Sequence, residues 1–209
     1  TGRTVRTMSE APPTTWIGSP FFNDRGAVRP EAVVLHIAEG SLAGVDSWFN
    51  DPRAQVSAHF CVGYYGDIHQ YVDLPQAAWA NGRIEAGATA ALIKENGSIN
   101  PNLWSISIEH EGKSGEEPTV AQFEASAQLS AWLFGIMAES SITGLAVDRK
   151  HILRHGDISP VSRPNCPGWS EVTLTRYIRR VQQLVAPPAA VDVEAIKARL
   201  HEALKLLGE

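Results

Sequence analysis

Glu31-Ala32-Val33-Val34-Leu35-His36-Ile37 is the stretch that decides the fold, and a histidine stands near its end. Apolar residues in unbroken succession are typical of a short strand buried on both faces, as in the centre of an α/β sheet. Ser41 then offers an N-cap, and apolar residues at helical spacing predict a helix to about Asn50, stopped by Pro52. His36 therefore lies where a strand passes into a helix, and strand ends are where open α/β sheets collect their sites.

Two further strand patterns follow along the chain. Residues 57–64 and 68–72 flank a Gly-Asp turn and predict an antiparallel hairpin, with His59 and Cys61 on one face of its first strand. The pattern leaves open which of the two faces is core. Residues 105–112 alternate, so that one face of the predicted strand carries Ser107, Glu109 and Glu111.

The remaining chain divides by composition and period. Thr119 and Gln122 form a capping box for a helix to about Glu139, and a last amphipathic helix covers 174–185. Residues 73–104 read as a long loop with one helical turn near 88–93. The predicted organisation is an N-terminal arm at 1–30, a main domain at 31–185, a Pro/Ala linker at 186–190, and an amphipathic helix at 191–209. We expect that helix to pack on its parent domain or on a second copy of the chain.

Composition excludes several classes of protein. The 209 residues suit one globular domain with an appendage, and a net charge of −5 with a pI near 5.8 gives no basic field for nucleic acid. Two cysteines do not make a disulfide scaffold. No apolar run approaches the ~18 residues of a membrane span, and no signal-peptide pattern is visible.

Arg154 to Gly168 concentrates more chemistry than any other stretch, because it holds His155, Arg163 and Cys166 in a loop rich in Pro and Gly. We interpret this loop as half of a zinc site. Catalytic zinc usually takes three protein ligands and keeps a fourth position for water, so a third ligand must come from elsewhere. His36 is the candidate because it ends a buried strand, and a His-His-Cys set is an accepted combination.

Other residues could complete the chemistry. Glu109 is the candidate general base, and Arg163 is the candidate cation beside a developing oxyanion. The alternative for both is a solvated surface position. His59 is expected to be a core or supporting histidine, with a place near the site as its alternative. His69 and His201 are expected to face solvent, and His151 to pack beside the loop.

Several motifs in order resemble the zinc-dependent N-acetylmuramoyl-L-alanine amidases, the superfamily that also contains phage amidase lysozymes and peptidoglycan recognition proteins. The resemblance covers about residues 31–185. It is carried by Val33-Val34-Leu35-His36, Val56-Ser57-Ala58-His59-Phe60, Gly66-Asp67-Ile68-His69-Gln70, Ala78-Trp79, residues 105–112, His155-Gly156-Asp157-Ile158 and Cys166-Pro167-Gly168.

This resemblance implies a mixed β-sheet flanked by α-helices and one Zn²⁺ per chain. The implied reaction is hydrolysis of the amide between the muramic lactyl group and the L-alanine of the stem peptide. The implied zinc ligands are His36, His155 and Cys166, with Glu109 and Arg163 as catalytic residues. Substrate contacts are implied for Trp79, Asn81 and His59.

Three departures from the family pattern stand out. Ala58 replaces a tyrosine that some branches use, which leaves the role of the base to Glu109. Many members have a lysine either eight residues after the second histidine, which is Arg163 here, or two before the last ligand, which is Pro164. Arg163 is the only cation nearby, and a guanidinium is no simple substitute for an ammonium. Asn81 stands in a Trp-x-x-Gly segment where several relatives have histidine.

The resemblance thus implies a cell-wall lytic amidase of the phage or prophage endolysin kind, bacteriolytic and released from the host cytoplasm by lysis or a holin-type system. Its partner would be peptidoglycan, both glycan strand and stem peptide. The alternative is a non-catalytic peptidoglycan-binding protein of the same fold. Since such recognition proteins typically lack the cysteine ligand, Cys166 favours the enzyme.

Overall fold

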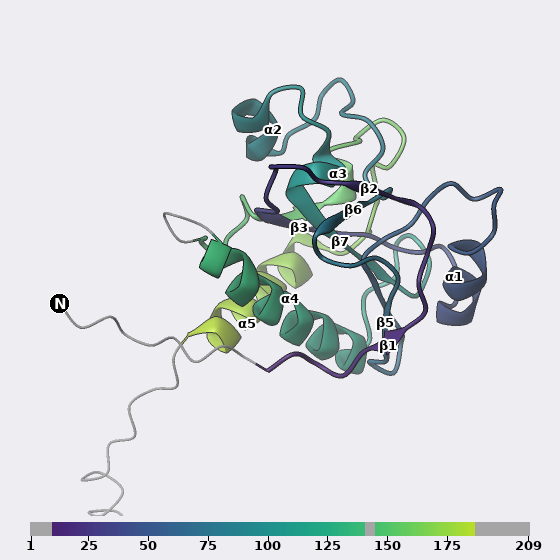
Figure 1. Cartoon of the computed structure of the whole chain (residues 1–209). Helices are drawn as coiled ribbons and strands as arrows, with labels where there is room; N and C mark the ends of the chain where they lie inside the picture. Colours follow the sequence, from purple (N-terminus) through teal and green to yellow (C-terminus); the bar gives the residue numbers. More distant parts are fainter. Residues whose placement is uncertain (1–9, 141–144, 187–209) are drawn as a thin grey trace, which may run out of the picture. The chain divides into compact units, whose positions relative to one another are not determined.

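A six-stranded mixed sheet organises the chain in the computed structural model, which describes residues 10–140 and 145–186 (Figure 1). The strand order is β1-β5-β4-β7-β3-β8, and β2 and β6 form a separate pair. The strands are β1 (Thr15–Trp16), β2 (Phe22–Asp24), β3 (Ala32–Leu35), β4 (Phe60–Val62), β5 (Ile68–Gln70), β6 (Gln76–Ala78), β7 (Ser105–His110) and β8 (Ile152–Arg154). The helices are α1 (Leu42–Trp48), α2 (Ala91–Asn96), α3 (Pro101–Trp104), α4 (Val120–Ser140), the 3-10 helix η1 (His155–Asp157) and α5 (Glu171–Val185).

The predicted buried strand lies inside the parallel part of the sheet. All four residues of β3 are fully buried, and β3 pairs in parallel with β7 on one side and β8 on the other. β4 joins β7 in parallel and β5 antiparallel. The sheet is therefore mixed, as expected, and the four parallel strands β4, β7, β3 and β8 direct their carboxyl ends to one edge.

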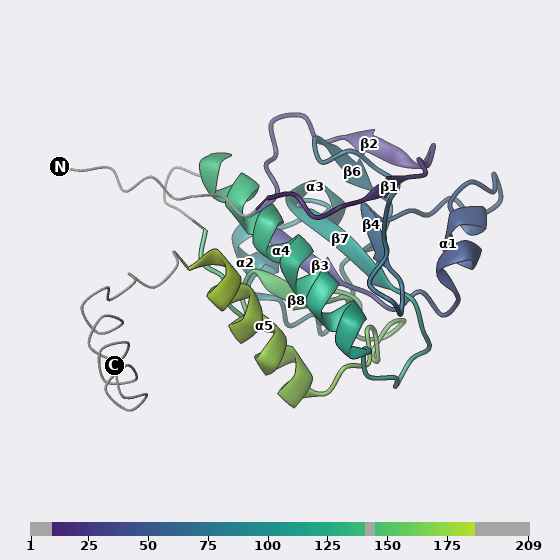
Figure 2. The ribbon, with the colours of Figure 1, turned by 90° about the horizontal axis from the view of Figure 1, so that it is seen from below.

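Helices cover both faces of this sheet. Figure 2 shows α4 and α5 side by side over one face, where Leu133 and Tyr177 pack on Val33, Phe60 and Ile106. On the other face, Val34 packs with residues of α2 and α3, and Cys61 packs with residues of α1. Both faces of the hairpin strand are thus core, which answers the question that the alternation left open.

The predicted helices form, with differences at their ends. Ser41 caps α1 by accepting a hydrogen bond from Gly44 N at 3.1 Å, as predicted. Thr119 likewise accepts from Gln122 N, but the Gln122 amide donates to the carbonyls of Val62 and Glu111. The predicted capping box is therefore half formed, because Gln122 instead satisfies carbonyl groups at the end of the sheet.

The long-loop prediction for residues 73–104 was wrong in part. This segment contains β6 and two short helices, and β6 pairs antiparallel with β2 from the N-terminal arm. Three-residue strands are too short to give a period, so pairing with a distant segment determines them. The helix predicted at 191–209 lies outside the described residues. In the part of the chain that is described, no helix is long and apolar enough to cross a membrane.

A buried arginine ties the N-terminal arm to the sheet. Arg25 is 5% exposed and donates to the carbonyls of Leu74, Asn102 and Ser105. Its Nη2 also lies 2.7 Å from His59 Nε2, while His59 Nδ1 accepts from Ser107 N at 3.0 Å. Burial, followed by the Arg25 charge, lowers the pKa of His59 to about 3. His59 is therefore held neutral by its surroundings.

This placement predicts acid sensitivity of the fold. Between pH 6.5 and about 3 the unfolded chain binds a proton at His59 that the folded chain does not, so stability is complete above pH 6.5 and is lost as the pH falls. The slope from this residue reaches about 1.4 kcal/mol per pH unit. In urea titrations at several pH values, His59→Gln should be less stable at pH 7 but flatter between pH 6.5 and 4. If the free energy of unfolding fell equally with pH in the protein with and without His59→Gln, this prediction would be contradicted.

Candidate active site

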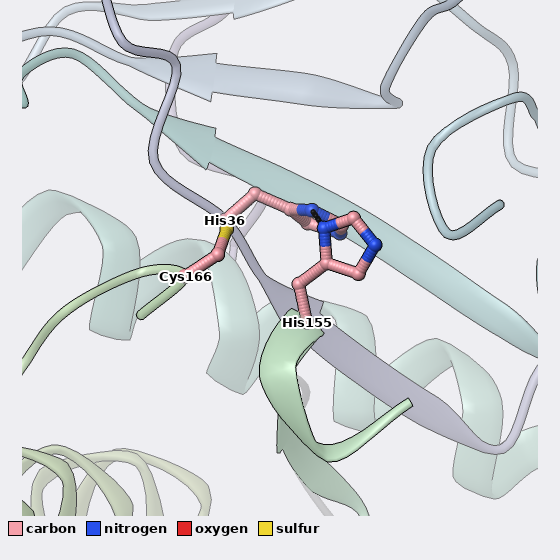
Figure 3. A group of neighbouring side chains, drawn as sticks. All are labelled: His36, His155 and Cys166. Atoms are coloured by element: carbon pink, nitrogen blue, oxygen red, sulfur yellow. Dashed lines mark hydrogen bonds between the residues drawn. The ribbon is translucent and has the colours of Figure 1, made fainter. Parts of the chain in front are cut away.

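The parallel pairing of β3 and β8 brings two histidines together. Leu35 is paired with Arg154, so the next residues of the two strands, His36 and His155, emerge side by side at the carboxyl edge. Their Nδ1 atoms are 3.0 Å apart and their ring centroids 4.5 Å apart. Figure 3 shows the two rings facing each other, one from the end of β3 and one from η1.

The loop after η1 returns to deliver Cys166 to the same place. Gly156 N donates to Cys166 O at 3.1 Å, and Cys166 Sγ accepts from Ile37 N at 3.3 Å. A Cβ on Gly156 would lie 2.9 Å from Arg163 O and 3.0 Å from Pro164 O. Only glycine allows this close approach of the two ends of the loop. The Cys166–Pro167 peptide bond is cis.

These three side chains fit a zinc ion by their chemistry. All three are buried, and one potential ligand atom from each lies within 4.8 Å of the others. Two imidazoles and one thiol are a recognised zinc ligand set that leaves a fourth position free. The His36, His155 and Cys166 cluster predicted from the sequence therefore exists as a spatial group.

Burial sets the charge states around this cluster. Desolvation, reinforced by the charge of His155, lowers the pKa of His36 well below its usual value, and desolvation lowers that of His155 to about 4. Both rings are therefore neutral near pH 7, the form in which imidazole binds a metal. Burial, with Glu109 adding, raises the pKa of the Cys166 thiol to about 12. A thiolate at this position therefore needs a cation beside it.

Glu109 reaches the cluster from the other neighbour of β3. Leu35 pairs with Ile108 of β7, so Glu109 lies beside His36, with Oε1 3.9 Å from His36 Nδ1. Its side chain is 15% exposed, and among the described residues its Oε2 has no hydrogen-bond partner. Burial raises the pKa of Glu109 to about 8, against a lowering by the Arg163 charge. This carboxyl group can therefore take up and release a proton near neutral pH.

The cluster lies in an open cleft of about 750 Å³ whose lining includes Trp48, Trp79, Glu109 and Arg163. A second cleft of about 620 Å³ adjoins it and shares Trp79, His155 and Arg163. Arg163 is exposed, and its Nη1 donates to Ser162 O at 2.9 Å. Its charged head is therefore free to turn toward a bound molecule in either cleft.

Two of the residues with predicted substrate contacts have buried side chains. The Asn81 side chain is fully buried and donates to Ser105 Oγ at 2.8 Å, while its backbone carbonyl lies 3.2 Å from His155 Nε2. His59 is 1% exposed and lies under the sheet edge with Arg25, as expected for a core or supporting histidine. Asn81 is also among the residues that line the smaller cleft, so its contact with a substrate stays a prediction.

Sequence reasoning missed Trp48, which lines the larger cleft with 48% of its surface exposed. It is one of the apolar residues at helical spacing that predict α1, and that spacing indicates no role at the site. Helical period alone does not distinguish a core residue from one at the margin of the buried face. A large aromatic residue within a turn of the helix end, following a histidine-bearing strand, is the signal that could have found it.

Comparison with known proteins gives consistent matches. The sequence model of the family described as N-acetylmuramoyl-L-alanine amidase matches residues 26–169. N-acetylmuramoyl-L-alanine amidase A of Achromobacter lyticus is 32% identical over 131 residues, which are 60% of this chain and 64% of that protein. The chain thus spans a little under two thirds of this curated relative.

Two solved structures share the fold. The crystal structure of a selenomethionine AmpD derivative superposes with a TM-score of 0.58 at 20% identity, covering 83% of this chain and 99% of that one. A mutant endolysin from Bacillus subtilis superposes with a TM-score of 0.55 at 16% identity, covering 81% and 98%. At these identities the likeness establishes the mixed α/β fold.

Proposed function

Because the chain belongs to the N-acetylmuramoyl-L-alanine amidase family, we propose that it hydrolyses the amide between N-acetylmuramic acid and the L-alanine of peptidoglycan, with zinc as its cofactor. One observation carries the proposal most directly. The cleft that would receive the substrate has His36, His155 and Cys166 on its lining, and Glu109 is beside them. The A. lyticus relative, named as such an amidase, supports the same substrate.

His36, His155 and Cys166 would hold the ion. Zinc, when bound, supplies a Lewis acid that polarises a carbonyl and lowers the pKa of water toward neutrality. The buried, neutral imidazoles give this site its preference for a metal over a proton. Ile37 N, which donates to Cys166 Sγ, holds the sulfur in its place on the cleft lining.

Glu109 would move the proton during hydrolysis. The carboxylate accepts a proton from the attacking water as the new C–O bond forms at the lactyl carbonyl carbon. It then returns that proton to the alanine nitrogen as the C–N bond breaks, which releases a free amine and a lactyl carboxylic acid. The burial of Glu109 suits both proton transfers, because a raised pKa lets the same carboxyl group act first as the base and then as the acid.

Arg163 would stabilise the negative charge that develops on the carbonyl oxygen. It lines both clefts, and its side chain is exposed, so it can approach the reacting group when substrate binds. Guanidinium is planar and offers two parallel N–H groups where the family lysine offers a single ammonium. We infer that Arg163 takes over the lysine's electrostatic role with two-point hydrogen bonding.

The biological setting that we propose is lysis of the bacterial wall, in the manner of an endolysin. The fold shared with the B. subtilis endolysin supports this role, although AmpD shares the same fold. A bacteriolytic enzyme of this kind should clear suspensions of susceptible cells or purified walls. It should do so without added proteins.

Digestion of purified cell wall tests the chemistry. The expected products are free L-alanine amino groups without new reducing sugar ends, identified by mass spectrometry. Treatment with a chelator should abolish the release, and stoichiometric Zn²⁺ should restore it. New reducing ends alone would refute the amidase assignment, and tight wall binding without any cleavage would point to a recognition protein instead.

A further inference from the structure

One wall of the cleft is built by a segment that precedes the part of the chain matched by the family. We call Phe21–Arg25 the N-terminal wall. The family match begins at residue 26, whereas β2, inside this wall, pairs antiparallel with β6 at Phe22–Ala78, Asn23–Ala77 and Asp24–Gln76. Trp79 directly follows β6, so the pairing brings the wall against the cleft-lining indole.

Two side chains of the wall contact Trp79 itself. Asn23 Oδ1 accepts a hydrogen bond from Trp79 Nε1 at 2.6 Å. The Phe21 ring lies 5.6 Å from the Trp79 ring, centroid to centroid, at an interplanar angle of 34°. The indole N–H is thus hydrogen-bonded and the indole ring is in contact with Phe21. These two contacts together restrict the two side-chain torsions of Trp79.

The backbone on either side of this contact is fixed as well. Ser57 Oγ donates to Phe21 O at 2.5 Å and accepts from Trp79 N at 3.0 Å. At the other end of the wall, Arg25 Nη1 donates to Asn102 O at 2.9 Å. The amide side chain of Asn102 in turn accepts from Asn81 N at 2.8 Å, two residues beyond Trp79. The backbone that carries the indole is therefore fixed by hydrogen bonds at Trp79 and at Asn81.

Trp79 lies where the two clefts adjoin. It lines both clefts, together with His155 and Arg163, and Asn23 lines the smaller one. Its side chain is half-buried, so part of the ring remains available to a bound molecule. Because the Trp79 ring is already fixed where the two clefts adjoin, it loses no rotamer freedom when a substrate binds to it.

We propose that Phe21 and Asn23 are positioning residues, which hold the Trp79 indole as a fixed wall for the part of the substrate beside the scissile amide. Substrate affinity would then depend on residues outside the family-matched segment. This inference rests on the proposed amidase function. It is specific to the wall, because among the described residues the hydrogen bonds and ring contacts of the wall reach neither Glu109 nor the three candidate metal ligands.

The test compares Asn23→Leu with the unchanged protein, using a purified muropeptide with zinc present. Losing one hydrogen bond to the indole should raise KM about fivefold. The kcat should stay within about twofold, because an interaction made equally in the ground and transition states changes KM alone. Zinc content should be unchanged. Asp24→Asn is the matched control on the same strand. The Asp24 carboxylate accepts a hydrogen bond from Gly26 N in the turn that follows, so this substitution should leave KM unaltered.

A double-mutant cycle with Trp79→Phe identifies the partner. Phenylalanine lacks the indole N–H, so Asn23→Leu should have no further effect on KM in that background. Three results would overturn the inference. The KM of Asn23→Leu could be unchanged, or its effect could add fully to that of Trp79→Phe. The third is a fall in both the kcat and the thermal stability of Asn23→Leu.

Binding of the same muropeptide, measured by calorimetry in a Glu109→Gln background, separates the two proposals. If the protein without substitutions binds the muropeptide but does not cleave it, the amidase function is refuted. The expected fivefold difference in affinity between proteins with and without Asn23→Leu then still tests the role of the wall. A muropeptide that is neither cleaved nor bound refutes both.

Discussion

Cys166→Ser is expected to lose both zinc and hydrolysis, with zinc content falling from about one per chain to nearly none. Serine keeps the size of the side chain but is a much weaker zinc ligand than a thiolate, so two histidines alone would have to hold the ion. Since the metal supplies several kcal/mol of charge stabilisation, kcat/KM should fall by about 10³-fold or more. Elemental analysis of the purified protein and release of alanine amino groups from wall provide the two measurements.

Cys61→Ala is the matched control for this experiment. Cys61 is the other free cysteine, fully buried in β4 and packed with residues of α1, away from the cleft lining. Its removal should keep one zinc per chain and nearly full activity, with a modest loss of stability from the small cavity. If Cys166→Ser kept zinc and activity, the sulfur would not be a ligand and the proposed site would be wrong.

Glu109→Gln should keep zinc and lose the chemical step. Glutamine fits the same space but cannot accept a proton, and general base catalysis contributes about 10²- to 10⁴-fold. The kcat should fall by that amount while zinc content and affinity for the wall stay close to those of the unchanged protein. Stopped digestion with quantified amine release gives kcat, and pelleting with insoluble wall gives the affinity.

Glu111→Gln controls for the loss of a carboxylate near the end of the same strand. Glu111 Oε2 accepts from Tyr64 N at 2.9 Å, and the residue is not part of either cleft lining. Its activity should therefore be nearly unchanged. Equal losses in the two variants would mean that the strand end, rather than a proton acceptor at Glu109, supports the reaction.

The sequence could predict which residues gather at the site, because each follows a recognisable element. His36 ends an apolar run, and the period of two in β7 assigned Glu109 to the face opposite Ile108. It could not predict that β3 lies between β7 and β8 in parallel, since the register depends on pairing between distant segments. The pairing alone explains why His36, His155 and Glu109 meet.

Two side-chain placements could not be predicted, for one physical reason. Asn81 and His59 stand in motifs that resemble a site, which implied substrate contacts for both, although a core or supporting position was also expected for His59. The structure uses both to satisfy buried groups, the hydroxyl of Ser105 and the backbone N–H of Ser107. A sequence does not show which buried groups lack partners, so it cannot identify the side chains that must serve them. The same reason hid the buried position of Arg25.

Arg25 also determines where this domain can be cut and joined to another protein. A recombinant hybrid that began at the family boundary of residue 26 would leave out the guanidinium that binds the carbonyls of Leu74, Asn102 and Ser105. Those acceptors would lose a charged partner in the interior. Module exchange with related amidases should therefore splice the chain before β1, where residues 10–14 are mostly exposed.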